Sequence, residues 1–323
     1  MGGLENLGNT CFINTLIQCI AVSKYLKDVF ANLDPQDHKS LTYQLKDVIA
    51  KINNGHTLSP RGLINTIYRN FSTIIEPGHP HDICELWVLL SNAIHSECGV
   101  EYKNKDKPEI KDIKDKIKYD TKLHNEFKKS EITKTIQNIQ LSSIQCANNL
   151  CNHKTINSEV FNTMSIDIPI QSESIELLDC IKIYFITEEL SDWKCDNCKE
   201  TKANRLVRLW HIPNLLIINI KRFTYENGNL SRVNTPVNIP KKMVFYEGSI
   251  ISNPSKIYNY NLISIGNHLG GGFGGHYHAD VNRNNDWFRM DDESIYKIEE
   301  NDLEKILLNN IAGYILFYEL DNN

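Results

Sequence analysis

The amino-acid sequence predicts a protein of the α+β class, in which helices and strands occupy separate stretches of one chain. Helical periodicity, with apolar residues three and four apart, dominates the first third of the 323 residues. Alternating and continuous apolar runs, which are typical of strands, dominate from about residue 136 onward. A chain of this length buries a large core, either as one domain or as two closely packed lobes.

Four helices are predicted before residue 100. The first begins at Cys11 and continues to about Lys27, with a face formed by Ile13, Leu16, Ile17 and Ile20. The second covers 40–52. The third starts where Pro60 fits the first helical position, because its missing N–H is unpaired there in any helix. The fourth begins within the apolar stretch 78–90 and reaches about residue 94.

The middle of the chain predicts an exposed insertion followed by strands. Lysine, aspartate and glutamate alternate over 101–134, which favours a solvated helix or a partly mobile segment over a basic partner site. Strands are predicted over 136–144, 160–170, 206–210 and 215–223, with a short helix over 174–183. The strand 215–223 is apolar on both faces and is expected in the centre of a sheet. Lys221 and Arg222 are expected to be surface charges at its end.

Cys11 is a candidate nucleophile because it lies at the start of a predicted helix, with Asn9 and Thr10 at capping positions. Unpaired N–H groups and the helix dipole at such a position favour the thiolate over the thiol. The alternative is that Cys11 is a small buried apolar residue, as most unpaired cysteines are.

A second candidate group lies near the C-terminus, where the turn sequence 282–285 predicts a hairpin with a four-residue loop. If Val281 pairs with Asp286, then His276 lies opposite Asp291, with Cβ atoms about 4.5 to 5.5 Å apart. A histidine beside a carboxylate is the base and its orienting acid in a catalytic triad. His278, on the same face, is a competing base, and Asp292 is expected to point to the other face.

Two cysteine pairs predict a structural zinc site. Cys146 and Cys151 form the first pair, and Cys195 and Cys198 form the second, 44 residues later. Two close cysteine pairs separated by a long stretch of sequence are typical of a four-thiolate zinc site that holds two hairpin tips together. The first pair has the wide spacing CxxxxC, so two alternatives stay open. His153 replaces one sulfur, or the site is degenerate and holds no metal.

Composition narrows the classes of function. The chain has 35 basic and 40 acidic side chains and a pI near 6.1, which does not favour nucleic-acid binding. It has no apolar run long enough for a membrane span and no secretory signal pattern, so neither membrane insertion nor secretion is expected. Nine cysteines, an odd number, fit a reducing compartment, and we expect an intracellular, cytoplasmic or nuclear protein.

Two long stretches resemble the Cys box and His box of the ubiquitin-specific protease family of deubiquitinating enzymes. Residues 3–18 read GLENLGNTCFINTLIQ, and residues 274–292 read GGHYHADVNRNNDWFRMDD. The family patterns are approximately GLxNLGNTCFMNSxLQ and GHYxA(x)nWxxxDD. Chance agreement of two such motifs in the right order is below roughly one in a hundred. The resemblance covers nearly the whole chain.

The resemblance implies a papain-like cysteine protease fold in one catalytic domain over 1–323. It implies a helical thumb over about 1–125, β fingers with a zinc ribbon over about 126–210, and a β palm over about 211–323. The four cysteines fall where many family members hold their zinc, although the family usually shows CxxC in the first pair. The glycine-rich stretch 270–275 resembles a family loop that flanks the substrate's tail, and no helix follows it as a phosphate loop requires.

The resemblance also implies a deubiquitinase that cleaves after the C-terminal glycine of ubiquitin. Cys11 is then the nucleophile, His276 the general base and Asp291 its orienting acid, with Asn6 as an oxyanion donor. Asp292 either assists the oxyanion region or substitutes for Asp291.

The stretch 78–90 resembles the family pattern QQDAxEFLxxLLD, whose acids, here Asp82 and Glu85, contact arginines of ubiquitin's tail. The alternative is that both acids only cap a helix. We expect ubiquitin and ubiquitinated proteins as partners, and a monomer. Two rival functions stay open: a non-catalytic ubiquitin-binding module, or a protease for another ubiquitin-like modifier.

Overall fold

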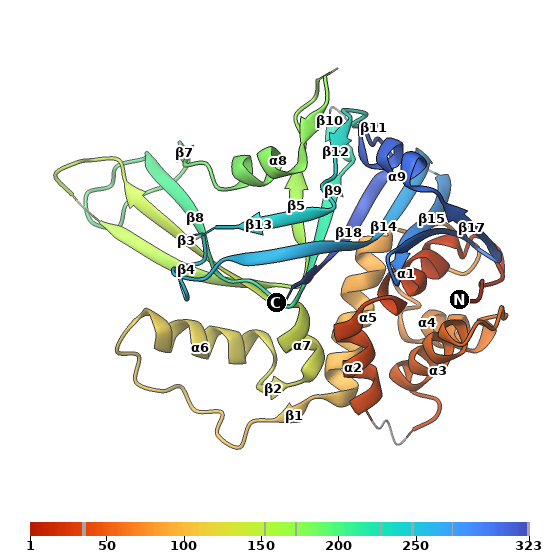
Figure 1. The fold of residues 1–323 in the computed structure, drawn as a ribbon. Coiled ribbons are helices and arrows are strands. Elements are labelled where there is room, and N and C mark those ends of the chain that lie inside the picture. The colour runs from red at the N-terminus through yellow and green to blue at the C-terminus, as the bar shows by residue number, and fades with distance from the viewer. Residues whose placement is uncertain are drawn as a thin grey trace.

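A computed structural model describes residues 1–33, 37–151, 153–171, 173–226, 228–246, 249–272 and 274–321. Helices from the N-terminal third gather on one side of a large sheet, and a smaller sheet extends away from its other end (Figure 1). The N-terminal helices are α1 (Cys11–Ala21), α2 (Lys24–Asn32), α3 (Leu41–Asn53), α4 (Arg61–Asn70) and α5 (Ile83–Cys98). The protein is therefore α+β, as the sequence predicts.

The predicted first helix is interrupted. Helix α1 ends at Ala21 instead of continuing to about Lys27, and α2 begins three residues later, at Lys24. Ser23 causes the new start, because its side chain accepts a hydrogen bond from the Leu26 N–H and caps α2. Helix α3 confirms the second predicted helix. Helix α4 begins one residue later than predicted, so that Pro60 is its N-cap and not its first residue.

The charged insertion forms mostly exposed structure. Strands β1 (Val100–Glu101) and β2 (Lys128–Lys129) pair with each other, and α6 (Ile113–His124) lies between them in sequence. One residue of α6, Ile117, is buried, which confirms a solvated helix. The helix packs along β4 (Lys154–Phe161) of the smaller sheet (Figure 1). Helix α7 (Glu131–Ile136) follows and joins the insertion to the smaller sheet.

Across the described residues, eight strands form the large sheet in the order β17-β16-β15-β14-β18-β9-β5, with β13 beside β14. In chain order they are β5 (Met164–Asp167), β9 (Leu215–Lys221), β13 (Lys242–Phe245), β14 (Tyr258–Gly271), β15 (Gly274–Arg283), β16 (Asp286–Asp291), β17 (Ser294–Ile298) and β18 (Gly313–Leu320). Strand β9 lies between β18 and β5 and is buried along most of its length, which confirms its predicted central place.

The prediction that Arg222 is a surface charge is wrong. Its side chain is fully buried and donates to the backbone oxygens of Gly313, Thr235 and Asn310 at 2.6 to 3.2 Å. These carbonyls satisfy the guanidinium, which makes its burial possible. Lys221 is exposed and pairs with Asp167 at 3.0 Å, as a strand-end charge should.

The smaller sheet has the order β4-β3-β8-β7. It consists of β3 (Asn138–Cys146), β4, β7 (Glu188–Leu190) and β8 (Ala203–His211). The single strand predicted over 160–170 is wrong, because the chain leaves β4 at Phe161 and enters β5 of the large sheet at Met164. The remaining elements are β6 (Ile175–Glu176), α8 (Leu177–Tyr184), β10 (Phe223–Glu226), β11 (Asn229–Arg232), β12 (Val237–Asn238) and α9 (Glu300–Leu307).

Helix α1 is the central element of the core between the helices and the large sheet. All 11 of its residues are buried, and it contacts β14, β15, α3 and α5. Gly266 of β14 lies against Ile315 of the neighbouring strand β18, because a Cβ there would meet Ile315 Cγ2 at 2.6 Å. A second core covers the opposite face of the sheet under α8 and α9. The first residue of α1, Cys11, therefore lies where the helices meet the sheet.

Candidate active site and metal centre

Cys11 is the first residue of α1, and 5% of it is exposed. Thr10 is the N-cap, as predicted, although its hydroxyl accepts a hydrogen bond from the Leu7 N–H and not from the helix. Burial raises the pKa of the Cys11 thiol, while hydrogen bonds from the backbone N–H groups of Tyr277, Phe12 and Cys11 itself lower it. The N–H groups act in the predicted direction, but burial is the larger effect, so the expectation of a lowered pKa is wrong.

His276 and Asp291 meet through a hydrogen bond of 2.6 Å between Nε2 and Oδ1. A carboxylate accepts, so the proton lies on Nε2 and Nδ1 is left for another partner. The Tyr277 N–H that bonds to the Cys11 sulfur belongs to the residue directly after His276. Both side chains of the pair are about 40% exposed, at 42% and 40%. The structure thus pairs His276 with Asp291 and places the backbone of the next residue, Tyr277, at the Cys11 thiol.

The predicted hairpin register is wrong by two residues. Arg283 pairs with Asp286, so the loop contains two residues and not four. Its residues Asn284 and Asn285 have φ angles of 53° and 71°, as a two-residue type I′ turn requires. The ladder ends at Ala279, before His276. A shift of two residues keeps every side chain on its face, so the contact forms diagonally and not between directly opposed positions.

His278 does not occupy the position of a base. It is 5% exposed, and its Nε2 lies 4.0 Å from Asp280 Oδ2. That carboxylate is already bound by Arg289 at 2.8 and 3.0 Å and by the side-chain amide of Asn267 at 2.9 Å. Burial lowers the pKa of His278. The geometry therefore favours His276 as the base.

Asp292 connects the N-terminal segment to the hairpin. Its Oδ2 accepts from the Asn6 amide at 2.9 Å, its Oδ1 accepts from the Asn14 amide at 2.8 Å, and its backbone oxygen accepts from the Leu4 N–H at 2.9 Å. Asn6 Oδ1 in turn accepts from the backbone N–H groups of Gly8 and Thr10 at 3.0 and 3.2 Å. Asn6 is thereby fixed in one orientation, with one amide N–H free of these contacts.

Asp82 caps α5. Its Oδ1 accepts from the N–H groups of Cys84 and Glu85 at 2.7 and 3.0 Å, and its Oδ2 accepts from the Tyr314 hydroxyl. The capping alternative is therefore the structural role of Asp82. Glu85 lies exposed on the first turn of α5, and within the described residues it has no hydrogen-bond or ion-pair partner for its carboxylate.

A cleft runs beside these groups. A cavity of about 510 Å³ is lined by His81, Phe223, His268, Gly275, Tyr277 and Tyr314, among others. A second cavity of about 540 Å³ contains Cys84, Glu85 and Asn219, and Asp82 lines both. The glycines of 270–275 other than Gly270 line the first cavity, as predicted for a segment beside the cleft, and Phe273 lies outside the described residues.

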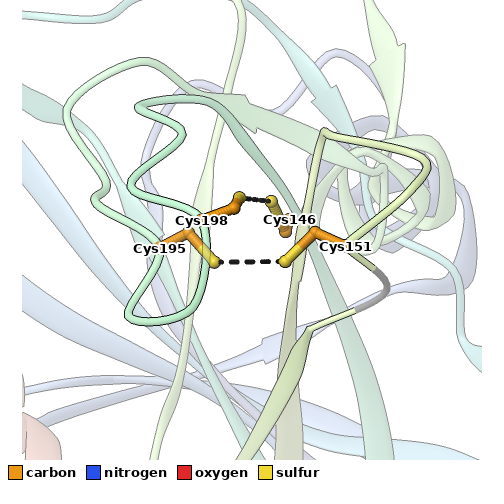
Figure 2. Close-up of side chains that lie close together, drawn as sticks. All are labelled: Cys146, Cys151, Cys195 and Cys198. Atoms are coloured by element: carbon orange, nitrogen blue, oxygen red, sulfur yellow. Dashed lines mark hydrogen bonds between the residues drawn. The ribbon is translucent and has the colours of Figure 1, made fainter.

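Cys146, Cys151, Cys195 and Cys198 form one cluster whose sulfur atoms all lie within 4.8 Å of one another. Figure 2 shows the four side chains pointing toward one another from two loops. The Sγ atoms of Cys146 and Cys198 are 3.6 Å apart, and those of Cys151 and Cys195 are 3.7 Å apart. Four sulfurs around a tetrahedral zinc, each about 2.3 Å from it, are about 3.8 Å apart. The donor set fits zinc, and His153 is not part of it.

A family model described as ubiquitin carboxyl-terminal hydrolase matches residues 2–318. The chain belongs to this family. It is 23% identical over 355 residues to ubiquitin carboxyl-terminal hydrolase 21 of Homo sapiens, covering 98% of this chain and 61% of that protein. It is 32% identical over 154 residues to ubiquitin carboxyl-terminal hydrolase 9 of Arabidopsis thaliana, covering 46% of this chain and 16% of that protein. The chain thus spans less than two thirds of these relatives' length.

Solved structures show the same fold. The chain is similar to a structure of the SAGA Ubp8/Sgf11/Sus1/Sgf73 DUB module bound to ubiquitin aldehyde, with a TM-score of 0.77 and 20% identity over 100% of this chain and 70% of that chain. A structure of the module bound to monoubiquitin gives a TM-score of 0.76, also at 20% identity, over 100% of this chain and 69% of that one. The N-terminal helices are therefore the thumb, the large sheet is the palm and the small sheet forms the fingers.

The sequence did not single out five residues that shape the site. Asn14 holds Asp292, Tyr314 holds Asp82, Tyr277 and His268 line the cleft, and Arg232 contacts His268. They come from α1, β11, β14, β15 and β18, and most lie in patterns that describe ordinary buried strands. Only folding brings them together. Asn14, a polar residue within an apolar helix, was the one available signal.

No described helix has both the length and the hydropathy to cross a membrane.

Proposed function

We propose that this protein is a cysteine-type deubiquitinase with Cys11, His276 and Asp291 as its triad. One observation carries the proposal: His276 is hydrogen-bonded to Asp291, and the backbone of the next residue, Tyr277, lies at the Cys11 thiol, while Tyr277 itself lines a cavity of about 510 Å³. Family membership and the ubiquitin aldehyde on a structural neighbour support ubiquitin as the substrate.

The chemistry follows from these groups. His276 Nδ1 takes the proton of Cys11, and the thiolate attacks the carbonyl carbon of ubiquitin's C-terminal glycine. The tetrahedral intermediate collapses as His276 returns the proton to the leaving lysine amine. A water molecule, deprotonated by His276, then hydrolyses the thioester and regenerates the thiol. Asp291 holds the imidazole through Nε2 and stabilises its cationic form. Because burial raises the pKa of Cys11, His276 is needed to form the thiolate.

The oxyanion is expected to bind the free N–H of Asn6 and the backbone N–H of Cys11. Asp292 is then not a member of the triad but a support for Asn6, since both of its carboxylate oxygens are bound by asparagine amides. Preorganised donors of this kind stabilise charge that develops in the transition state.

The cleft is expected to take the extended C-terminal tail of ubiquitin. Glu85 offers an exposed carboxylate for an arginine of the tail. Asp82 accepts a hydrogen bond from Tyr314, which lines the cleft, and another from the backbone at the N-terminus of α5. Of the two acids predicted to bind ubiquitin, Glu85 is the one whose carboxylate the described structure leaves open.

The four cysteines are expected to hold zinc at the tip of the fingers. Thiolates of Cys146, Cys151, Cys195 and Cys198 make a closed set, which leaves no position for a reacting water. When bound, the metal supplies a crosslink between the loop after β3 and the loop before β8. The division of the chain near residues 125 and 210 remains part of this proposal.

Reaction with full-length ubiquitin that carries a C-terminal electrophile tests the proposal, read by intact mass and peptide mapping. A single ubiquitin adduct on Cys11 is expected, absent in Cys11→Ala and slowed in His276→Ala. A folded protein that binds ubiquitin without forming an adduct would instead be a non-catalytic module. A protein that neither reacts nor binds would direct the search to other ubiquitin-like modifiers.

A further inference from the structure

Arg232, at the end of β11, makes four hydrogen bonds beside the cavity that His268 lines. One terminal nitrogen donates to His268 Nδ1 at 2.9 Å and to the Gly270 oxygen at 3.0 Å. The other donates to the backbone oxygens of His268 and Ile311 at 2.8 and 2.9 Å. The guanidinium also lies 5.4 Å from the centre of the Phe223 ring. Arg232 therefore joins β11 to the first residues of the glycine-rich segment.

These contacts determine where His268 carries its proton. A guanidinium has donors and no acceptor, so Nδ1 of His268 must accept from Arg232. A neutral imidazole that accepts at Nδ1 carries its only proton on Nε2. Burial, followed by the charge of Arg232, lowers the pKa of His268 to about 4, although Asp82 acts in the opposite direction. At neutral pH the ring is therefore uncharged and held as a single tautomer.

His268 lines the cavity, and its protonated nitrogen lies beside another lining residue. A Cβ built on Gly275 would lie 2.5 Å from His268 Nε2, so Nε2 lies directly over a glycine that lines the cavity. The ring is held between Tyr277 and Phe223, at centroid distances of 4.5 and 5.6 Å. Within the described residues Nε2 has no hydrogen-bond partner. A directed N–H in a narrow cleft suits the backbone carbonyl of an extended peptide.

We infer that Arg232 is a positioning residue that holds His268 as an Nε2–H donor to a backbone carbonyl of the substrate's C-terminal tail. It also holds Gly270, which lies next to described glycines that line the same cavity. This inference rests on the proposed function, because it names how that cleft recognises its peptide. The absent side chain at Gly275 is part of the arrangement, because any Cβ there would displace the imidazole or the backbone.

Nitrogen NMR of protein labelled at histidine tests the tautomer without reference to activity. The wild type is expected to show His268 as one Nε2–H tautomer between pH 6 and 8, assigned by its loss in His268→Gln. Arg232→Met, which keeps much of the side-chain length but none of the donors, is expected to mix the two tautomers. An unchanged His268 spectrum in Arg232→Met would overturn the inference.

Steady-state cleavage of a ubiquitin substrate tests the role in recognition. Arg232→Met is expected to raise KM about 3- to 10-fold with little change in kcat, because a lost hydrogen bond to bound peptide affects ground and transition states alike. Arg232→Lys should recover part of the loss, and Arg61→Met serves as the control for losing an exposed arginine. His268→Gln, which keeps a neutral N–H, should bind ubiquitin more tightly than His268→Ala.

The two failures are distinguishable. If wild-type protein neither cleaves nor binds ubiquitin, the proposed function fails whatever the tautomer. If the wild type cleaves ubiquitin and Arg232→Met leaves KM unchanged while folding normally by thermal denaturation, the inference about Arg232 fails alone. A fall in kcat at constant KM would also overturn it, because that result places Arg232 in the chemical step and not in peptide binding.

Discussion

At the scale of single residues, the site depends on side chains that hold other side chains. Asp292 fixes Asn6, Asp291 fixes His276, and Arg232 fixes His268. Each contact removes rotational freedom that would otherwise be lost when substrate binds or the transition state forms. Substitution of the supporting residue should therefore lower activity in the same way as substitution of the residue it supports.

The pair of Asn6 and Asp292 provides a direct test of this dependence. Asn6→Ala is expected to lower kcat about 100- to 1000-fold, because one oxyanion donor is lost. Asp292→Ala is expected to give a loss in the same direction, since nothing then holds the Asn6 amide.

A double-mutant cycle in kcat measures the coupling. The double variant should be little worse than Asn6→Ala alone. Independent, multiplying losses would show that Asp292 acts through some group other than Asn6.

The low pKa of His268 predicts a dependence of stability on pH. The unfolded chain binds a proton at this histidine near pH 6.5, whereas the folded protein does so only near pH 4. Unfolding therefore takes up a proton between these values, so His268 lowers the free energy of unfolding as pH falls from about 6.5 to 4.

Urea denaturation across this range, in wild type and His268→Gln, isolates the contribution. The difference in unfolding free energy between the two proteins should shrink toward acid pH. A constant difference would mean that His268 titrates alike in both states.

At the scale of elements, the break between α1 and α2 shows how one polar residue ends a helix that apolar periodicity would continue. Ser23 is fully buried, caps α2 and donates a hydrogen bond of 2.7 Å to Glu319 at the end of β18. Burial raises the pKa of Glu319, and Ser23 opposes this shift. The cap thus also fixes the thumb to the palm.

Ser23→Ala and Ser40→Ala form a matched pair for this role. Ser40 caps α3 through the Tyr43 N–H, and its removal is expected to cost about 1 kcal/mol. Ser23→Ala should cost about 2 kcal/mol, because it removes a cap and also one of the donors to the buried Glu319 carboxyl group. Chemical denaturation compares the two variants. Equal costs would show that the Glu319 contact adds nothing to the cap.

At the scale of the whole molecule, the fold and the pairing of His276 with Asp291 were predictable where the signal was local. Cys11 at a helix start and His276 near an acid needed only short stretches of sequence. The predicted hairpin register was wrong by two residues. Asn284 and Asn285 both adopt positive φ, which permits a tighter turn than the polar run 282–285 indicates. Burial of Arg222 could not be predicted from the sequence, because the backbone oxygens that accept its hydrogen bonds come from distant parts of the chain.

Removal of zinc tests whether the four cysteines bind the metal and whether the metal stabilises the protein. Chelation is expected to expose the four clustered thiols to a thiol reagent and to lower the thermal stability of the protein. Cys198→Ser should lower the zinc content measured by metal analysis, whereas Cys98→Ser, outside the cluster, should leave it unchanged. A purified wild-type protein without zinc would contradict the assignment of the metal.

The position of α1 has a consequence for how the molecule is made. During synthesis Cys11 leaves the ribosome long before the hairpin that carries His276 and Asp291. Until β14 and β15 are available, the apolar face of α1 that packs on them has no sheet to cover it. Until then the nascent chain exposes the apolar face of α1, which favours aggregation. Burial of α1 and the placement of the His276–Asp291 pair beside it therefore depend on the same strands, β14 and β15.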